Sequence, residues 1–141
     1  MKILGFNFTK MNIEKISDNL DNLKITTGID ISDMNEVKSD LFKSKEELIG
    51  VKFKYSINYE KDIARIDFEG NLVLLTDEKE AKEVLAQWKE KKIPEAFKLN
   101  LFNIILKKSS LKALQFEEEF NLPPHIPLPS FKPAEKKNNL L

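Results

Sequence analysis

Residues 122–129, which read LPPHIPLP, limit what this chain of 141 residues can fold into. Proline fixes φ and lacks a backbone donor, so this segment can be neither a helix nor a central strand. Its apolar residues, Leu122, Ile126 and Leu128, must therefore cover apolar surface or leave that surface exposed. We call residues 122–129 the arm. The longest uninterrupted helical pattern in the chain, residues 94–119, comes shortly before it.

Four stretches ahead of that helix alternate apolar and polar side chains, which is the pattern of half-buried strands. They are residues 3–9, 23–33, 49–59 and 63–75. The short polar turn between the last two indicates a hairpin. Residues 12–22 are expected to be a loop or a short helical turn, and residues 34–50 a charged connection.

Only helical patterns follow the strands. Asp77 and Glu80 have the spacing of a capping box at the start of a helix over residues 78–92. Strands first and helices afterwards predict an α+β fold, a four-stranded antiparallel sheet with two C-terminal helices packed on one face. Residues 1–131 are expected to form a single domain, and residues 132–141 a disordered polar tail.

The composition argues against most catalytic and metal chemistry. There is no cysteine, and His125, the only histidine, lies between prolines rather than beside a nucleophile. We therefore expect no enzyme, no cofactor and no metal site, and His125 is expected to face solvent or a partner. Asp30 with Asp33, and the glutamates at 117–119, lack the spacing of a calcium loop. The three glutamates are interpreted as a solvated helix end, and residues 107–110 as a solvent-facing or bent part of the helix.

The charge pattern gives little reason to expect a nucleic-acid or membrane partner. Lysine plus arginine and aspartate plus glutamate number 23 each, and Arg65 is the only arginine. The N-terminal apolar run is too short and polar for a signal peptide, and no apolar run could span a bilayer. A cytoplasmic protein without membrane insertion is therefore expected.

Aromatic residues are frequent on the predicted strands, and two interpretations remain open. They could fill the core between sheet and helices, with the arm closing an edge. Alternatively, sheet, helix and arm could border an apolar groove for extended polypeptide. The candidate groove residues are Phe6, Phe8, Phe116, Phe120, Leu122, Ile126 and Leu128.

Two stretches, FNFTKMNIEKIS at residues 6–17 and LPPHIPLPSF at residues 122–131, carry a resemblance to a known family. With the order of elements, they resemble the SecB family of export chaperones and small SecB-like proteins outside the export pathway. The resemblance implies the family's four-stranded sheet with helices on one face. It also implies subunit pairs that form a tetramer, and ATP-independent binding of unfolded polypeptide clients along apolar grooves.

The chain departs from this family in its charge. The family's export chaperones are acidic and dock the SecA motor, whereas Lys132, Lys136 and Lys137 outnumber Glu135 in the tail. This counts against SecA docking. One alternative is a ribosome- or complex-associated structural protein that docks through the arm and lysine-rich helix faces, without a client groove. In the chaperone interpretation, the arm could line the groove or contact a neighbouring subunit.

Overall fold

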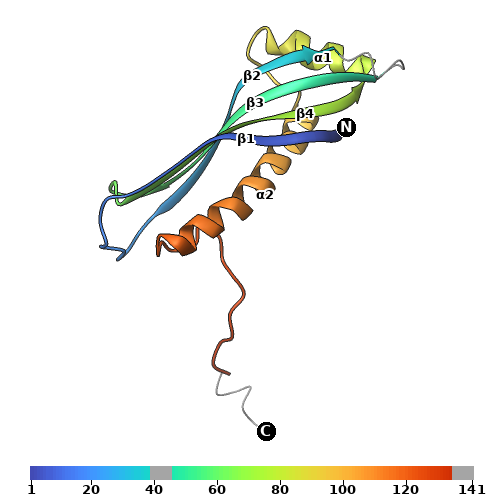
Figure 1. Ribbon diagram of the computed structural model, residues 1–141. Helices are drawn as coiled ribbons and strands as arrows, with labels where there is room; N and C mark the ends of the chain where they lie inside the picture. The colour runs from blue at the N-terminus through green and yellow to red at the C-terminus, as the bar shows by residue number, and fades with distance from the viewer. Residues whose placement is uncertain (39–45, 135–141) are drawn as a thin grey trace.

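The computed structural model describes residues 1–38 and 46–134, which form one antiparallel sheet followed by two helices (Figure 1). The strands are β1 (Lys2–Lys15), β2 (Ile25–Val37), β3 (Glu46–Tyr59) and β4 (Ala64–Asp77). The helices are α1 (Glu78–Trp88) and α2 (Glu95–Glu119). The strand order is β1-β4-β3-β2, so β1 and β2 are the edges. The predicted fold class is confirmed.

One face of the sheet carries the hydrophobic core. In β3, Val51, Phe53 and Tyr55 are buried, while Lys52 and Lys54 between them are exposed on the other face. Neighbouring strands keep this register, because Tyr55 pairs with Phe68 of β4 and Phe53 with Gly70. Ala81 and Val84 of α1 and Phe97 and Leu101 of α2 join the same core. An antiparallel sheet that is packed on one face and polar on the other explains the alternation in the sequence.

β1 is longer than the sequence pattern predicted. The prediction of a loop or helical turn over residues 12–22 is wrong for residues 12–15, because β1 continues to Lys15. The cause is a bulge in the pairing with β4 between Phe8 and Lys10. A bulge inserts one residue and shifts the side-chain alternation, so that Met11 and Ile13 follow Phe8 on the inner face. A period-2 pattern is interrupted there although the strand is not.

The remaining boundaries agree more closely. Asp77 accepts a hydrogen bond from the Glu80 backbone at 2.7 Å, which confirms the predicted cap of α1. α1 ends at Trp88, four residues earlier than predicted, whereas α2 ends at Glu119 as expected. Residues 34–37 belong to β2 and residues 46–50 to β3, so the predicted connection is too long. Its residues 39–45, and residues 135–141 of the predicted tail, lie outside the described residues.

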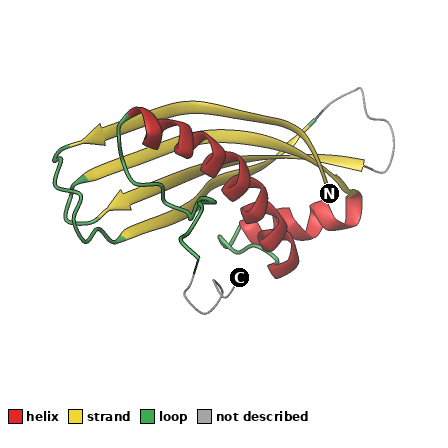
Figure 2. Cartoon of the chain, turned by 90° about the horizontal axis from the view of Figure 1, so that it is seen from below, coloured by secondary structure: helices red, strands yellow, loops and turns green. Residues whose placement is uncertain are grey.

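α2 crosses the sheet on a stripe of buried residues spaced four apart (Figure 2). These are Phe97, Leu101, Ile105, Ser109, Ala113 and Glu117. Such a stripe winds slowly around the helix, which suits packing against a twisted sheet. Ser109 and Ser110 are buried, so the prediction that residues 107–110 face solvent is wrong for both serines. Their small side chains let the middle of α2 approach the sheet closely.

Gly70 provides the first test of this packing. A methyl group at Gly70 would lie 2.5 Å from the Asn7 carbonyl oxygen and 2.7 Å from the Phe53 ring. Because a backbone atom cannot move away cheaply, Gly70→Ala is expected to lower the free energy of unfolding by about 2 kcal/mol or more. Urea denaturation measures this. Gly5→Ala, where no atom lies within 4 Å, is the control and should change it by less than about 0.5 kcal/mol.

Candidate functional site

The arm begins at a tightly hydrogen-bonded helix end. Asn121 adopts the left-handed conformation at φ 53°, which asparagine tolerates better than most residues. Its N–H donates to the Glu118 carbonyl at 3.2 Å, and the Leu122 N–H donates to the Glu117 carbonyl at 2.8 Å. This pair of bonds is a Schellman motif. It turns the chain sharply and directs the Leu122 side chain, 5% exposed, into the core.

Lys15 makes a second connection at this point. Its ammonium group donates to the Phe120 carbonyl at 2.9 Å and pairs with Asp18 at 3.0 Å. A cation at a helix C-terminus interacts favourably with the helix dipole. The C-terminal end of β1, which the sequence pattern missed, therefore fixes the place where α2 becomes the arm.

A buried polar network holds the arm against α2 and β3. The His125 ring lies over the end of α2 with its Nδ1 atom 2.8 Å from Glu117 Oε1, and both side chains are only 1% exposed. The Tyr59 hydroxyl donates to Glu117 Oε2 and lies 2.9 Å from the Pro123 carbonyl oxygen. The Tyr55 hydroxyl lies 3.1 Å from His125 Nε2. Arm, helix and sheet therefore share one set of hydrogen bonds.

Two sequence predictions are corrected here. His125 does not face solvent, and Glu117 does not belong to a solvated helix end. Both side chains lie at positions that look polar and exposed in the sequence, and only the Schellman turn brings them together. Buried polar groups need hydrogen-bond partners, so each of the two is placed by the other.

The proton positions in this network follow from its donors and acceptors. A carboxylate only accepts, so Nδ1 carries the proton toward Glu117 and Nε2 can accept from Tyr55. Ser110 lies 3.2 Å from the Tyr55 hydroxyl and donates to it. Ser110 thus reaches the imidazole only through Tyr55, so His125 is not placed to take its proton directly. The arrangement is suited to holding the arm in position.

Burial controls the ionisation of both tyrosines. Desolvation raises the pKa of Tyr55, and the negative charge of Glu117 adds to this, while the hydrogen bond from Ser110 acts in the opposite direction. Desolvation also raises the pKa of Tyr59, followed by the hydrogen bond and the charge of Glu117. Both phenols therefore keep their protons in the folded protein at pH values where free tyrosine has lost them.

This predicts a defined alkaline limit of stability. A raised folded-state pKa means that the folded state holds the phenol proton more tightly than the unfolded state. The two tyrosines therefore contribute fully to the free energy of unfolding below about pH 10, and this contribution is lost as the pH rises above that value. The free energy of unfolding should fall above about pH 10. Tyr55 and Tyr59 are the only tyrosines, so tyrosinate absorbance should appear together with unfolding. Tyr59→Phe should weaken this dependence; phenols that titrate in the folded protein near pH 10 would contradict it.

An aromatic cluster lies between β1 and α2, next to the buried polar network. The ring of Phe8 lies 5.3 Å from that of Phe68, and Phe68 lies 5.8 Å from Phe116 on α2. Phe6 lies 5.1 Å from Phe8 and 5.2 Å from Phe53. Three of the predicted groove residues, Phe6, Phe8 and Phe116, therefore belong to one cluster and are half-buried.

Next to this cluster lies an open hollow of about 640 Å³ between β1 and α2. Met1 and Ile3 line it from the side of β1, and Ile104 and Leu111 from the side of α2. We call these four residues the β1–α2 groove. Lys107 and Lys108 border it, and the Lys108 ammonium group lies 5.5 Å from the centre of the Phe6 ring. Lys108 therefore connects the border of the groove with the aromatic cluster.

The other predicted residues lie elsewhere. Leu122 is part of the core rather than of an open surface. Phe120, Ile126 and Leu128 are exposed, the last by 55%, and the chain after the network runs away from the body of the protein (Figure 1). The four residues of the β1–α2 groove were not predicted. Leu111, which is 60% exposed, stands out only once the buried stripe of α2 is known, because a leucine in a helical pattern is ordinarily expected to face the core.

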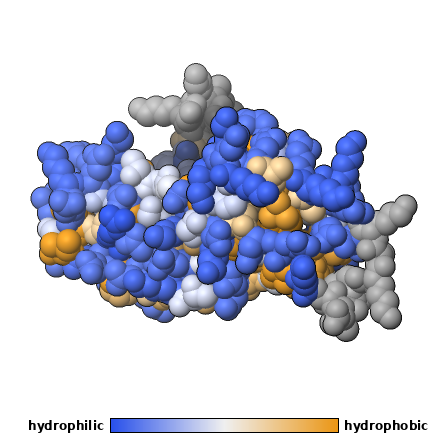
Figure 3. All heavy atoms as spheres, turned by 90° about the horizontal axis from the view of Figure 1, so that it is seen from above, coloured by the Kyte–Doolittle hydropathy of each residue, from blue (hydrophilic) through white to orange (hydrophobic). Residues whose placement is uncertain are grey.

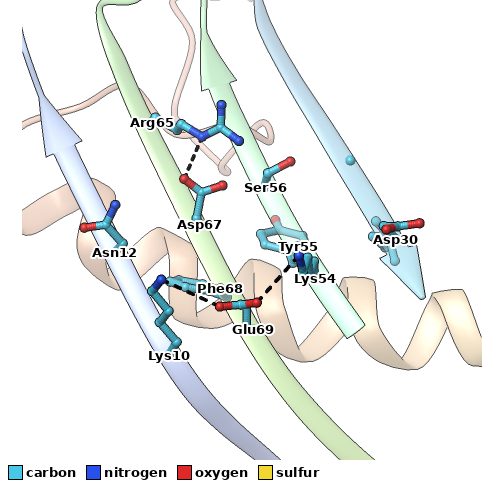
Figure 4. Close-up of a pocket in the computed structure, with 12 residues that line it drawn as sticks. Lys10, Asn12, Asp30, Lys54, Tyr55, Ser56, Arg65, Asp67, Phe68 and Glu69 are labelled. Atoms are coloured by element: carbon cyan, nitrogen blue, oxygen red, sulfur yellow. Dashed lines mark hydrogen bonds and ion pairs between the residues drawn. The ribbon is translucent and has the colours of Figure 1, made fainter. Parts of the chain in front are cut away.

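The sheet face away from the core carries paired charges. Glu69 on β4 lies between Lys10 and Lys54, at 3.9 and 3.8 Å, and Arg65 contacts Asp67 at 2.6 Å (Figure 4). These residues line a shallow hollow of about 500 Å³. Since each of these charges has a partner, this surface is less suited to a charged ligand. Seen from above, the protein surface is mainly hydrophilic with separate hydrophobic patches (Figure 3).

Two further findings concern metals and membranes. Within residues 1–38 and 46–134, no three His, Asp or Glu side chains gather closely enough to hold a metal ion. In the same part of the chain, neither helix is long and apolar enough to cross a membrane.

Comparison with known proteins gives one structural likeness. No family model matches the chain, and no curated protein matches it. Among solved structures, the chain is similar to the Mycobacterium tuberculosis Rv1957 SecB-like chaperone, solved in complex with a ChAD peptide from the Rv1956 HigA1 antitoxin. The match has a TM-score of 0.48 and 14% sequence identity, and it covers 95% of this chain and 92% of that chain.

Proposed function

We propose that this protein is a SecB-like, ATP-independent chaperone that holds non-native polypeptides in the β1–α2 groove. The observation that carries the proposal is an open apolar groove beside an aromatic cluster, on a protein whose helix and arm expose large apolar side chains. These exposed residues are Leu99, Leu106, Leu111, Ile126, Leu128 and Phe131. Exposed apolar surface of this kind is typical of sites that bind other polypeptides or further subunits. No catalytic step or cofactor is part of the proposal.

The groove suits a client of loosely defined sequence. Burying apolar side chains contributes about 25 cal/mol per Å² and needs no particular hydrogen-bond pattern, so many unfolded segments can bind. A single short contact binds weakly, because the client loses conformational entropy when it is ordered in the groove. Several grooves on one assembly increase the overall affinity. We propose a homo-oligomer built as a dimer of dimers. A client that folds buries its own apolar residues and leaves.

The arm contributes a surface that is ordered before a client arrives. Its prolines and the bonds of His125 fix its direction, so little conformational entropy remains to be lost on binding. Ile126 and Leu128 then present their side chains beyond the network, 40% and 55% exposed. They can extend a client surface or contact a neighbouring subunit.

The decisive test is suppression of aggregation. The protein at substoichiometric amounts should keep a chemically denatured test protein from aggregating without ATP, as light scattering would show. Leu111→Asp should weaken the effect through the groove, and Ile126→Asp with Leu128→Asp should weaken it through the arm, because a charge is costly in a buried apolar contact. Ser130→Asp, a charge added beside the arm, is the control. Absence of suppression at every ratio would refute the proposal.

Two measurements distinguish this function from the alternative of a ribosome- or complex-associated structural protein. A tetramer in solution, measured by light scattering with size-exclusion chromatography, supports the chaperone, and a strict monomer counts against it. The lysines beside the groove, Lys107 and Lys108, are the residues that a ribosome-bound protein would use. Co-sedimentation with ribosomes that disappears at high salt, without aggregation suppression, would favour that alternative.

A further inference from the structure

A second hollow lies at the opposite edge of the sheet, between β2, the end of α1 and the start of α2, with a volume of about 660 Å³. Its apolar lining is formed by Ile29 and Ile31 on β2, Trp88 on α1 and Phe102 on α2. Ile31 is buried, while the other three are half-buried and can be reached from outside. Trp88 is the only tryptophan of the chain.

Three lysines stand around this lining. Lys91 places its ammonium group 4.5 Å from the centre of the Trp88 ring, and Lys98 places its own 5.5 Å from the Phe102 ring. Lys92 is the third. None of the three forms an ion pair with another described residue, and Asp30 is the only acidic residue that lines the hollow. We call this site the basic hollow; its net charge is positive.

The backbone holds Lys91 in a conformation that lysine seldom adopts. Its φ is 60°, and its N–H donates to the Trp88 carbonyl at 2.8 Å, while the Lys92 N–H donates to the Gln87 carbonyl at 3.0 Å. This is a Schellman motif, and glycine is the residue usually found at its left-handed position. A lysine there costs stability that glycine would not. The same position supplies a charge beside the Trp88 ring.

Within residues 1–38 and 46–134, no strand pairs with the outer backbone edge of β2 beside the basic hollow. β2 is an edge strand, and its pairing to β3 uses only one of its two sides. Extended polypeptides bind such edges by adding a strand, and every second side chain of the added strand then faces the same side. Ile29 and Ile31 are on the helix side of β2, so a side chain of the added strand on that side would enter the basic hollow.

We propose that the basic hollow binds an extended polypeptide segment in which an aromatic side chain is flanked by aspartate or glutamate. The aromatic side chain occupies the space between Trp88 and Phe102, and the carboxylates pair with the three lysines. An RNA ligand is less favoured, because it cannot pair with a strand edge and the only arginine, Arg65, lies on the uncovered face of the sheet (Figure 4). This inference rests on the proposed function in taking a polypeptide as the ligand, and it adds a preference for acidic segments.

Trp88 fluorescence provides a direct test with the full-length protein. Two short peptides with a central phenylalanine and no tryptophan are titrated, one flanked by glutamates and one by lysines. The acidic peptide should change the Trp88 signal and bind at least about tenfold tighter, with a difference that shrinks at high salt. Lys98→Gln should weaken binding of the acidic peptide by about threefold, whereas Lys107→Gln, at the β1–α2 groove, should leave its binding unchanged.

Lys91→Gly separates binding from stability. Glycine suits the left-handed position, so this variant should be at least as stable as the wild type, yet it should bind the acidic peptide about threefold less tightly. Equal binding of the two peptides, or an oligouridylate that displaces the acidic peptide, would overturn the inference. If aggregation suppression persists in that case, the proposed function stands without it; if suppression is also absent, both fail.

Discussion

Glu117→Ala is expected to lower the free energy of unfolding by about 3 kcal/mol, the largest effect of any single polar substitution in this protein. The change removes the acceptor of the buried His125 Nδ1–H and leaves the Tyr59 hydroxyl with the Pro123 carbonyl oxygen alone. Leaving a buried donor unpaired costs more than the hydrogen bond itself contributes. Such a loss is a large fraction of the stability of an ordinary domain, about 5–15 kcal/mol. Urea denaturation followed by circular dichroism measures it.

Two neighbouring substitutions make this result interpretable. Glu118→Ala changes the next residue of α2, which is exposed, and should alter the free energy of unfolding by less than about 0.5 kcal/mol. Glu117→Gln keeps one oxygen acceptor, so its loss in free energy of unfolding should fall between those of Glu117→Ala and Glu118→Ala. A loss for Glu117→Ala as small as that for Glu118→Ala would mean that the buried polar network does not stabilise the fold.

His125→Ala is expected to cost about 2 kcal/mol and to create a site for free imidazole. The lost ring leaves Glu117 and Tyr55 facing a space in which an imidazole has its partners in place. A ligand that binds only the folded state stabilises it by mass action, so ten times its dissociation constant should restore about 1.4 kcal/mol. The measurement is the unfolding midpoint of the variant with and without imidazole.

The specificity of this rescue has a simple control. Imidazole should not stabilise the wild-type protein, in which His125 fills the site, and it should stabilise the double variant His125→Ala with Glu117→Gln, which keeps a single neutral acceptor, less than His125→Ala. The arm would also be less firmly held in His125→Ala, so imidazole should restore part of any lost aggregation suppression. If imidazole stabilises wild type and variant equally, it acts elsewhere, and the network does not position the arm.

The two hollows give the proposed chaperone an asymmetric surface. Met1, Ile3, Ile104 and Leu111 make half of the lining of the β1–α2 groove apolar, so in the proposed function this groove would select clients mainly by burial. The basic hollow at β2 adds an electrostatic preference beside an apolar lining. A client long enough to reach both edges of the sheet would contact both hollows.

The amino-acid sequence predicted the layers of this fold well. Alternation in β3 and β4 is regular because both strands lie in the middle of the sheet with one face on the core. The pattern failed at β1, where the bulge after Phe8 reverses the alternation and hides residues 10–15 of the strand. It also misjudged Ser109, because a buried serine on a helix looks like a solvent-facing one until its neighbours are known.

The candidate site was predicted only in part. Phe6, Phe8 and Phe116 do gather, since aromatic residues on a strand and on its covering helix share one core face. The β1–α2 groove and the basic hollow depend on how far α2 lies from each sheet edge, which no local pattern encodes. The position of Trp88 beside Lys91 likewise follows from the turn that ends α1.

The arm shows which features the sequence determines and which depend on the tertiary structure. Its four prolines determined from sequence alone that residues 122–129 are extended and outside the sheet, because proline lacks the donor and the freedom in φ that other structures need. The tertiary structure alone decided that His125 is buried against Glu117 and Tyr55 of its own chain. A hydrogen bond between residues far apart in sequence exists only after a turn and a sheet register have brought them together.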